Sequence, residues 1–268
     1  MKIACTTLAC PSWPLETIVE RFAEYGYDGL DFRGLGEQTE IWRLEEFSSK
    51  AAETAEKIAA GGLAVSGFSS SARMFHADPA DEAKSLAEVR QYAALCRKFD
   101  CHMIRVFGGG LEGAPIGEAV ETSVATLRKL AEAAGEGVTV AVETHDDWYR
   151  TAPLAEVFAK VDAPNVGVLW DMHHPFRMGG ESPQQTFDSV GRYTVAVHIK
   201  DSVPTGDGKH AYCLPGEGDV PLAEMIRLLR GGGYDGFLTF EWEKRWHPEL
   251  PEPEVALPAY VEFVRGIA

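Results

Sequence analysis

Carboxylate and imidazole side chains end four of the short β-branched segments in the second half of the chain. They are Glu143, Asp171, His198 and Glu241. Three carboxylates and one imidazole are hard or borderline ligands, a set that suits Mn²⁺, Mg²⁺, Co²⁺ or Zn²⁺. Four protein ligands also leave coordination positions open for substrate oxygens. The sequence therefore predicts one bound divalent metal ion, preferably Mn²⁺, held by these four side chains.

Taken singly, none of these residues indicates a metal. A carboxylate at a strand end is usually solvated or caps a helix, and a histidine there is more often hydrogen-bonded filler than a ligand. The indication comes from the register of the strands. In 138–143 and 194–199 the metal-competent residue shares a face with small or polar residues, while valine and isoleucine alternate onto the other face. Four such ends in a row are hard to explain as independent accidents.

The elements that must bring these residues together alternate regularly along the chain. Strands are predicted at 2–6, 28–33, 63–69, 102–107, 138–143, 166–171, 194–199 and 236–241. Helices are predicted at about 15–25, 44–60, 80–99, 116–134, 151–160, 183–190, 221–230 and 253–266. This alternation predicts a single (β/α)₈ TIM barrel over residues 1–268, in which the carboxyl ends of all strands open onto one mouth. The GxGxxG sequence of an open doubly wound sheet is absent.

Composition restricts the class of partner. The net charge of −16 disfavours nucleic acid, because affinity for phosphates depends largely on Lys and Arg. The sequence contains no uninterrupted apolar run of the roughly 18 residues that a membrane span requires, and its amino terminus lacks an apolar signal core. The five cysteines form no CxxC pair, so reduced thiols are expected. We expect a cytoplasmic enzyme with a small-molecule carbohydrate substrate, no nucleic-acid or membrane partner, and scope for homo-oligomer formation.

Further motifs extend the pattern around the four residues. They are the opening segment 24–33, Asp171-x-x-His174, His198-Ile-Lys200-Asp201 and Gly216-Glu-Gly-Asp-Val220. With these motifs the chain resembles the xylose isomerase-like (β/α)₈ superfamily over essentially its whole length. That superfamily includes sugar and sugar-phosphate epimerases, hydroxypyruvate isomerases, inosose dehydratases and apurinic endonucleases. The resemblance implies the ligand positions for the same four residues and a substrate contact for His174.

The reaction expected of such a site is proton transfer beside a carbonyl. A metal that chelates a carbonyl and its neighbouring hydroxyl stabilises an enediolate and lowers the barrier to removing the proton between them. Glu143 and Glu241, on strands separated by two others, can flank the substrate from opposite faces as the catalytic acid–base pair. The prediction is an isomerase or epimerase acting on a small sugar, sugar phosphate or related hydroxy-carbonyl compound. If a β-hydroxyl is lost instead, the activity is that of an inosose dehydratase-like lyase, which is the alternative.

Four residues near the same mouth are expected to bind substrate: His174, Arg105, Lys200 and His145. Arg105 shares its inward parity with Met103 and Phe107, and an arginine inside a barrel is costly unless it is paired or binds substrate. Two positions depart from the ketohexose 3-epimerases. Tyr149 stands where those enzymes have a second Glu, and Pro204 stands where they have an Arg. The identity of the sugar is therefore not carried over from them.

A metal-dependent endonuclease is the more distant alternative. Apurinic endonucleases of the superfamily have extra histidine ligands after strands three and four and an Asp-x-His pair after strand seven. The corresponding regions read Phe68-Ser-Ser-Ser, Arg105-Val-Phe and Asp207-Gly-Lys-His210 here. A trinuclear zinc cluster is therefore not expected.

Overall fold

Eight parallel strands close into a barrel in a computed structural model that describes residues 1–206 and 208–267. Around the barrel the order is β1-β10-β7-β6-β5-β4-β3-β2. The strands are β1 (Lys2–Thr6), β2 (Gly29–Phe32), β3 (Ala64–Arg73), β4 (Met103–Phe107), β5 (Thr139–Glu143), β6 (Val166–Asp171), β7 (Thr194–Ile199) and β10 (Phe237–Phe240). The predicted (β/α)₈ barrel is confirmed. Each predicted strand is present: β1, β6 and β7 have the predicted bounds, and the ends of the others are shifted by one to four residues.

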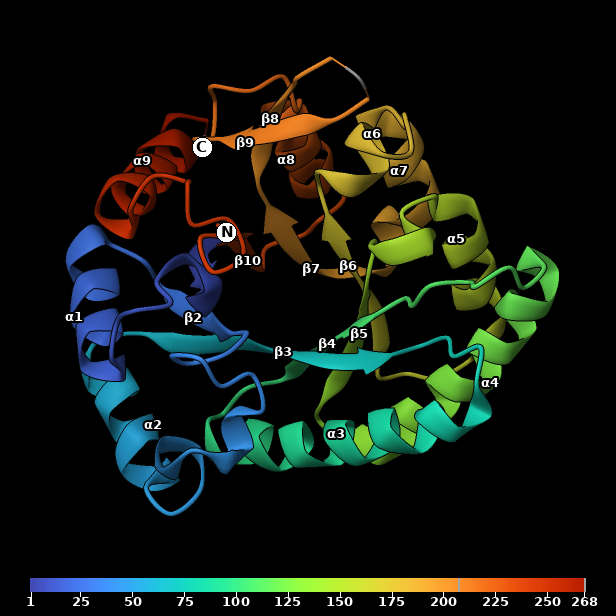
Figure 1. The fold of residues 1–268 in the computed structure, drawn as a ribbon, viewed down its shortest axis with the longest axis horizontal. Coiled ribbons are helices and arrows are strands. Elements are labelled where there is room, and N and C mark those ends of the chain that lie inside the picture. The colour runs from blue at the N-terminus through green and yellow to red at the C-terminus, as the bar shows by residue number, and fades with distance from the viewer. Residues whose placement is uncertain (207, 268) are drawn as a thin grey trace.

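Helices form a ring outside the strands (Figure 1). They are α1 (Leu15–Tyr25), α2 (Ala51–Ala60), α3 (Pro79–Lys98), α4 (Ile116–Ala134), α5 (Thr151–Lys160), α6 (His174–Arg177), α7 (Pro183–Val190), α8 (Leu222–Gly231) and α9 (Pro253–Gly266). Their apolar faces cover the outer surface of the barrel. In α1, for example, Ile18 and Phe22 recur at helical spacing and are fully buried, and the helix ends at Gly26 in the left-handed conformation.

Inside the barrel lie small, polar and charged residues, as the alternation predicts, together with the larger apolar Leu169 and Met103. Ala141, Leu169 and Ala196 form a small interior cluster with Met103 packed against it. Residues of opposite parity, such as Val197, belong to the large core between strands and helices. Because side chains alternate along a strand, Glu143, Asp171 and His198 lie on the same inner face as the interior cluster.

Three parts of the fold differ from the prediction. The short helix α6 was not predicted. The helix expected over 44–60 is divided, because Ser48 leaves helical geometry and its hydroxyl donates to the Leu44 carbonyl at 2.7 Å. A hairpin of β8 (Asp201–Pro204) and β9 (His210–Cys213) was not predicted. Its strands are too short to show a period of two, and it lies at the rim beside α6 (Figure 1). Asp207, in the motif compared with the endonucleases, lies outside the described residues.

The helices and the cysteines test two further expectations, on membrane spans and on thiol oxidation. None of the helices in the described part of the chain has both the length and the apolar character needed to cross a bilayer. All five cysteines are free thiols, and four of them are buried while Cys213 is half-buried.

Candidate metal centre

The four predicted ligands meet at the mouth of the barrel. Glu143, Asp171 and His198 stand at or near the carboxyl ends of β5, β6 and β7, and Glu241 directly follows β10. Each offers a ligand atom, and these atoms all lie within 4.8 Å of one another. His198 Nδ1 lies 3.0 Å from Glu143 Oε1 and 3.2 Å from Glu241 Oε1. Residues separated by as many as 98 positions in the sequence thus face one point.

The donor set fits a divalent cation. All four side chains are buried. The cations nearest to two of the carboxylate oxygens are Arg105, with Nε 3.3 Å from Glu143 Oε2, and Lys200, with Nζ 3.0 Å from Asp171 Oδ2. Three buried carboxylates that face one point are costly unless cations compensate their charge. Three carboxylates and one imidazole are also donors that Mn²⁺, Mg²⁺, Co²⁺ and Zn²⁺ accept. The residues present therefore match the single-ion centre that the sequence predicts.

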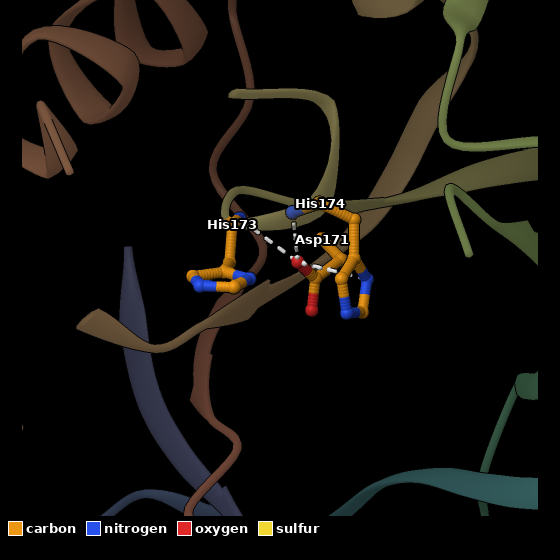
Figure 2. Close-up of side chains that lie close together, drawn as sticks. All are labelled: Asp171, His173 and His174. Carbon is orange, nitrogen blue, oxygen red and sulfur yellow. Dashed lines mark hydrogen bonds and ion pairs between the residues drawn. The ribbon is translucent and has the colours of Figure 1, made fainter. Parts of the chain in front are cut away.

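A tight turn after β6 orients Asp171. Its Oδ1 accepts the backbone N–H groups of His173 at 2.8 Å and His174 at 2.9 Å, so its Oδ2 is directed toward the other ligands. The two imidazoles flank this carboxylate (Figure 2). Asp171, His173 and His174 form a second group whose ligand atoms all lie within 4.8 Å of one another, close enough to hold a metal ion. In this group His173 Nε2 is already within 2.9 Å of Ser202 Oγ, and His174 Nδ1 lies 3.4 Å from Asp171 Oδ1.

Lys200 places an ammonium group among the carboxylates. Its Nζ lies 2.5 Å from Glu241 Oε2, 2.7 Å from Glu243 Oε1 and 3.0 Å from Asp171 Oδ2. Burial acts to lower the pKa of Lys200, but the three carboxylates outweigh it and hold this pKa well above its ordinary value. Lys200 is therefore a buried cation in contact with two of the four candidate ligands.

Charge interactions separate the pKa values of the ligands. Burial and Glu241 act to raise the pKa of Glu143, but Arg105 and His198 outweigh them and lower it. For Glu241, burial is outweighed by Lys200 and His198, so its pKa lies well below the ordinary value. Burial raises the pKa of Asp171 to about 6 despite Lys200. The pKa of His198 lies well above its ordinary value, because Glu241, Asp31 and Glu143 outweigh burial. Glu143 and Glu241 are thus both ionised at neutral pH.

The other residues expected to bind substrate surround the same centre. Arg105 donates from Nη1 to the Ser70 carbonyl at 2.8 Å, and its Nε lies 3.3 Å from Glu143 Oε2. The His145 ring contacts the His174 ring, with centroids 4.5 Å apart. Burial acts to lower the pKa of His145, but the hydrogen bond with Asp146 and the charge of Glu143 together outweigh it and raise this pKa. Burial, assisted by Lys200, lowers the pKa of His174 well below its ordinary value.

Comparison with known proteins decides the family. The family model described as xylose isomerase-like TIM barrel matches residues 19–265. The chain belongs to this family. A putative hydroxypyruvate isomerase of Streptomyces coelicolor is 26% identical over 179 residues, which cover 62% of this chain and 61% of that protein. The matched stretches span 30–61% of the length of the curated relatives, so the activity of those proteins is not transferred whole.

Two solved structures show the same xylose isomerase-like barrel over almost the whole length of both chains. The probable 3-DHS dehydratase of Bacillus anthracis is 20% identical, covers 99% of each chain and has a TM-score of 0.80. The D-psicose 3-epimerase of Clostridium cellulolyticum H10 is 18% identical, covers 100% of this chain and 99% of its own, and has a TM-score of 0.79. At these identities the likeness establishes the fold alone.

Three further residues at the centre of this family member were not singled out from its sequence. Asp31 and His173 are buried at the mouth, and Glu243 forms an ion pair with Lys200. Asp31 lies two residues before the end of the strand predicted at 28–33, and this place in a strand was the available signal. His173 and Glu243 each lie two residues from a recognised ligand, but spacing alone does not tell which neighbour of a ligand turns inward.

Proposed function

We propose that this protein is a divalent-metal-dependent isomerase or epimerase acting on a small sugar, sugar phosphate or related hydroxy-carbonyl compound. The observation that carries the proposal is the position of two ionised glutamates, Glu143 and Glu241, whose Oε1 atoms lie 3.0 Å and 3.2 Å from His198 Nδ1. They come from strands that are separated by β6 and β7 in the barrel. Carboxylates on two sides of one substrate carbon can remove a proton from one face and return it to the other.

Glu143, Asp171, His198 and Glu241 would hold the cation, and Mn²⁺ suits this donor set. When bound, it would supply Lewis-acid polarisation of a substrate carbonyl, which makes the neighbouring C–H more acidic. The proton itself is carried by the protein. Arg105 beside Glu143 and Lys200 beside Glu241 keep both carboxylates ionised and ready to accept it.

His174, His145, Arg105 and Lys200 are the proposed substrate contacts. His174 is neutral, so its ring can both donate to and accept from sugar hydroxyls. His145 lies against it and is oriented by Asp146, whose Oδ1 is 2.9 Å from His145 Nδ1. Arg105 is on β4, His145 and His174 follow β5 and β6, and Lys200 follows β7. From these positions the four groups would set the position of the carbon between the two glutamates.

An inosose dehydratase-like lyase is the second candidate. The contact between His145 and His174 favours it, because an imidazole beside the proton-abstracting carboxylate can protonate a departing β-hydroxyl. The likeness to a probable dehydratase over 99% of both chains is compatible with this reaction. An endonuclease activity finds less support, since the net charge of −16 opposes binding to a polyanion.

Exchange of substrate protons with solvent tests the step that both reactions share. Ketoses, ketose phosphates and inososes would be incubated in deuterated buffer with the protein, with and without Mn²⁺, and followed by NMR. We expect metal-dependent loss of the proton beside the carbonyl in at least one class. An epimeric or isomeric product identifies the first activity, and an unsaturated product identifies the dehydratase. If duplex DNA containing an abasic site is cleaved while no carbonyl compound exchanges, the proposal is wrong.

A further inference from the structure

A buried carboxylate beside the centre has no assigned role. Asp31 lies on β2 and is 1% exposed. Its Oδ1 accepts a hydrogen bond from Ser69 Oγ at 2.7 Å. Its Oδ2 has no hydrogen-bond partner within the described residues. A buried carboxylate oxygen without a donor is costly, so this placement calls for a compensating group.

The second nitrogen of the candidate ligand His198 is the nearest such group. His198 Nδ1 is directed toward Glu143 and Glu241, while Nε2 points the other way and also lacks a hydrogen-bond partner in the described part of the chain. Nε2 lies 3.8 Å from Asp31 Oδ2. An unsatisfied acceptor therefore faces an unsatisfied ring nitrogen. The separation exceeds an ordinary hydrogen bond by roughly 1 Å, which a small rotation of either side chain closes.

The barrel leaves space for this carboxylate. Gly67 of β3 stands in register with Asp31. A Cβ at Gly67 would collide with Met103 Cε and would lie 2.7 Å from Asp31 Oδ2, in both cases closer than real Cβ atoms approach another atom. A glycine on the neighbouring strand thus keeps open the position from which Asp31 reaches His198.

We propose that Asp31 is a positioning residue that accepts the Nε2–H of His198 and so directs Nδ1 toward the metal. The inference rests on the proposed metal centre. A neutral imidazole carries one proton, and an ion on Nδ1 requires that proton to be on Nε2. Asp31 fixes this tautomer and the ring orientation, while Ser69 fixes Asp31. The role is distinct from that of the four ligands, because Asp31 acts on the cation only through His198.

Metal affinity is the first test. The Mn²⁺ dissociation constant of Asp31→Ala and Asp31→Asn would be measured by electron paramagnetic resonance of the free ion, which needs no substrate. We expect Asp31→Ala to bind about 10–100-fold more weakly than the wild type. Asp31→Asn should lose less, because an amide oxygen still accepts a hydrogen bond. Asp28→Asn is the matched control: it removes the same charge at the exposed beginning of the same strand and should leave the affinity unchanged.

The protonation pattern of His198 is the second test, and it separates positioning from a general charge effect. In Zn²⁺-loaded wild type labelled with ¹⁵N-histidine, NMR should show His198 with a proton on Nε2 that exchanges slowly with water. In Asp31→Ala that proton should exchange faster. If Asp31→Ala does not fold, the wild-type spectrum still decides, since an Nε2 without a proton overturns the proposal.

The two proposals fail in different ways. Wild-type protein that binds no divalent ion would overturn the metal centre and the role of Asp31 together. Wild-type protein that binds one ion, with unchanged affinity and unchanged Nε2–H exchange in Asp31→Ala, would overturn only the role of Asp31.

Discussion

At the scale of single residues, Glu143 and Glu241 are proposed to act both as ligands and as proton carriers. An amide oxygen can coordinate a cation but does not take up a proton near neutral pH. We therefore expect Glu143→Gln or Glu241→Gln to lower turnover by about 10²–10⁴-fold, while each variant keeps measurable metal binding. Assays of turnover and metal content on the same samples check this.

Deuterium exchange adds a control on the same variants. With one carboxylate left, exchange at the substrate carbon should persist from one face although net epimerisation fails. Near-normal rates in both variants would mean that the glutamates are only ligands and that another group, with His174 and Lys200 the next candidates, carries the proton.

The pKa values of the ligands predict how metal binding depends on pH. The raised pKa of His198 means that the apo protein binds a proton there at neutral pH, and Asp171, with a pKa of about 6, binds a second one in mildly acidic solution. A cation must displace both. Affinity should therefore rise with pH, and the number of protons released per ion should increase as pH falls through about 6. Calorimetry in buffers of different ionisation enthalpy measures this number, and a value of zero across the range would contradict the prediction.

At the scale of elements, Asp201 connects the loop 216–220 to the beginning of β8 by hydrogen bonds. Its carboxylate accepts the backbone N–H groups of Ser202 at 2.8 Å, Gly216 at 2.9 Å, Gly218 at 3.1 Å and Val220 at 3.3 Å. Asp201 is 1% exposed, and a Cβ at Gly218 would collide with it. The two motifs noticed in the sequence, His-Ile-Lys-Asp and Gly-Glu-Gly-Asp-Val, are thus halves of one structural unit.

We expect Asp201→Ala to lower the free energy of unfolding by about 2–5 kcal/mol, because it leaves several buried backbone donors unsatisfied. Gly218→Ala should also destabilise, through the collision with Asp201. Urea unfolding followed by circular dichroism measures both. Asp235→Ala, at an exposed position, is the control and should change stability by less than about 0.5 kcal/mol. An Asp201→Ala variant as stable as this control would show that the hydrogen bonds do not hold the loop.

At the scale of the whole molecule, the proposed cation would connect four neighbouring strands of the barrel. β5, β6, β7 and β10 each contribute one ligand at or next to the strand end, and these elements span residues 139–241 of the chain. A ligand that binds only the folded state stabilises it by about 2.7 kcal/mol at a concentration of 100 times its dissociation constant. Chelation should therefore lower Tm by roughly 5–10 °C for a chain of this size.

Differential scanning calorimetry with EDTA and with added Mn²⁺ checks this, together with elemental analysis, for which we expect one ion per chain. Asp171→Ala should abolish the response of Tm to metal. Three ions per chain would instead favour the endonuclease alternative. If wild-type Tm does not respond to either treatment, the cation makes no contribution to the stability of the barrel.

The sequence by itself determined the barrel and the members of the centre. The alternation of strands and helices follows from the local spacing of apolar residues along the chain. A parallel barrel brings the carboxyl end of every strand to one mouth. This topological rule is what allowed Glu143, Asp171, His198 and Glu241 to be grouped although they are far apart in the chain. Parity within a strand likewise placed Arg105 inside the barrel, where it is 1% exposed.

Only the tertiary structure decided how the groups around the centre are paired. Lys200 was expected to bind substrate, and its ammonium lies among Asp171, Glu241 and Glu243. Asp31 faces the second nitrogen of His198 because β2 and β7 lie on either side of β1 and β10 in the closed barrel. Such pairings depend on rotamers and on contacts across the barrel. Asp31 and His198 are more than 160 positions apart in the sequence, and local pattern carries no information about such contacts.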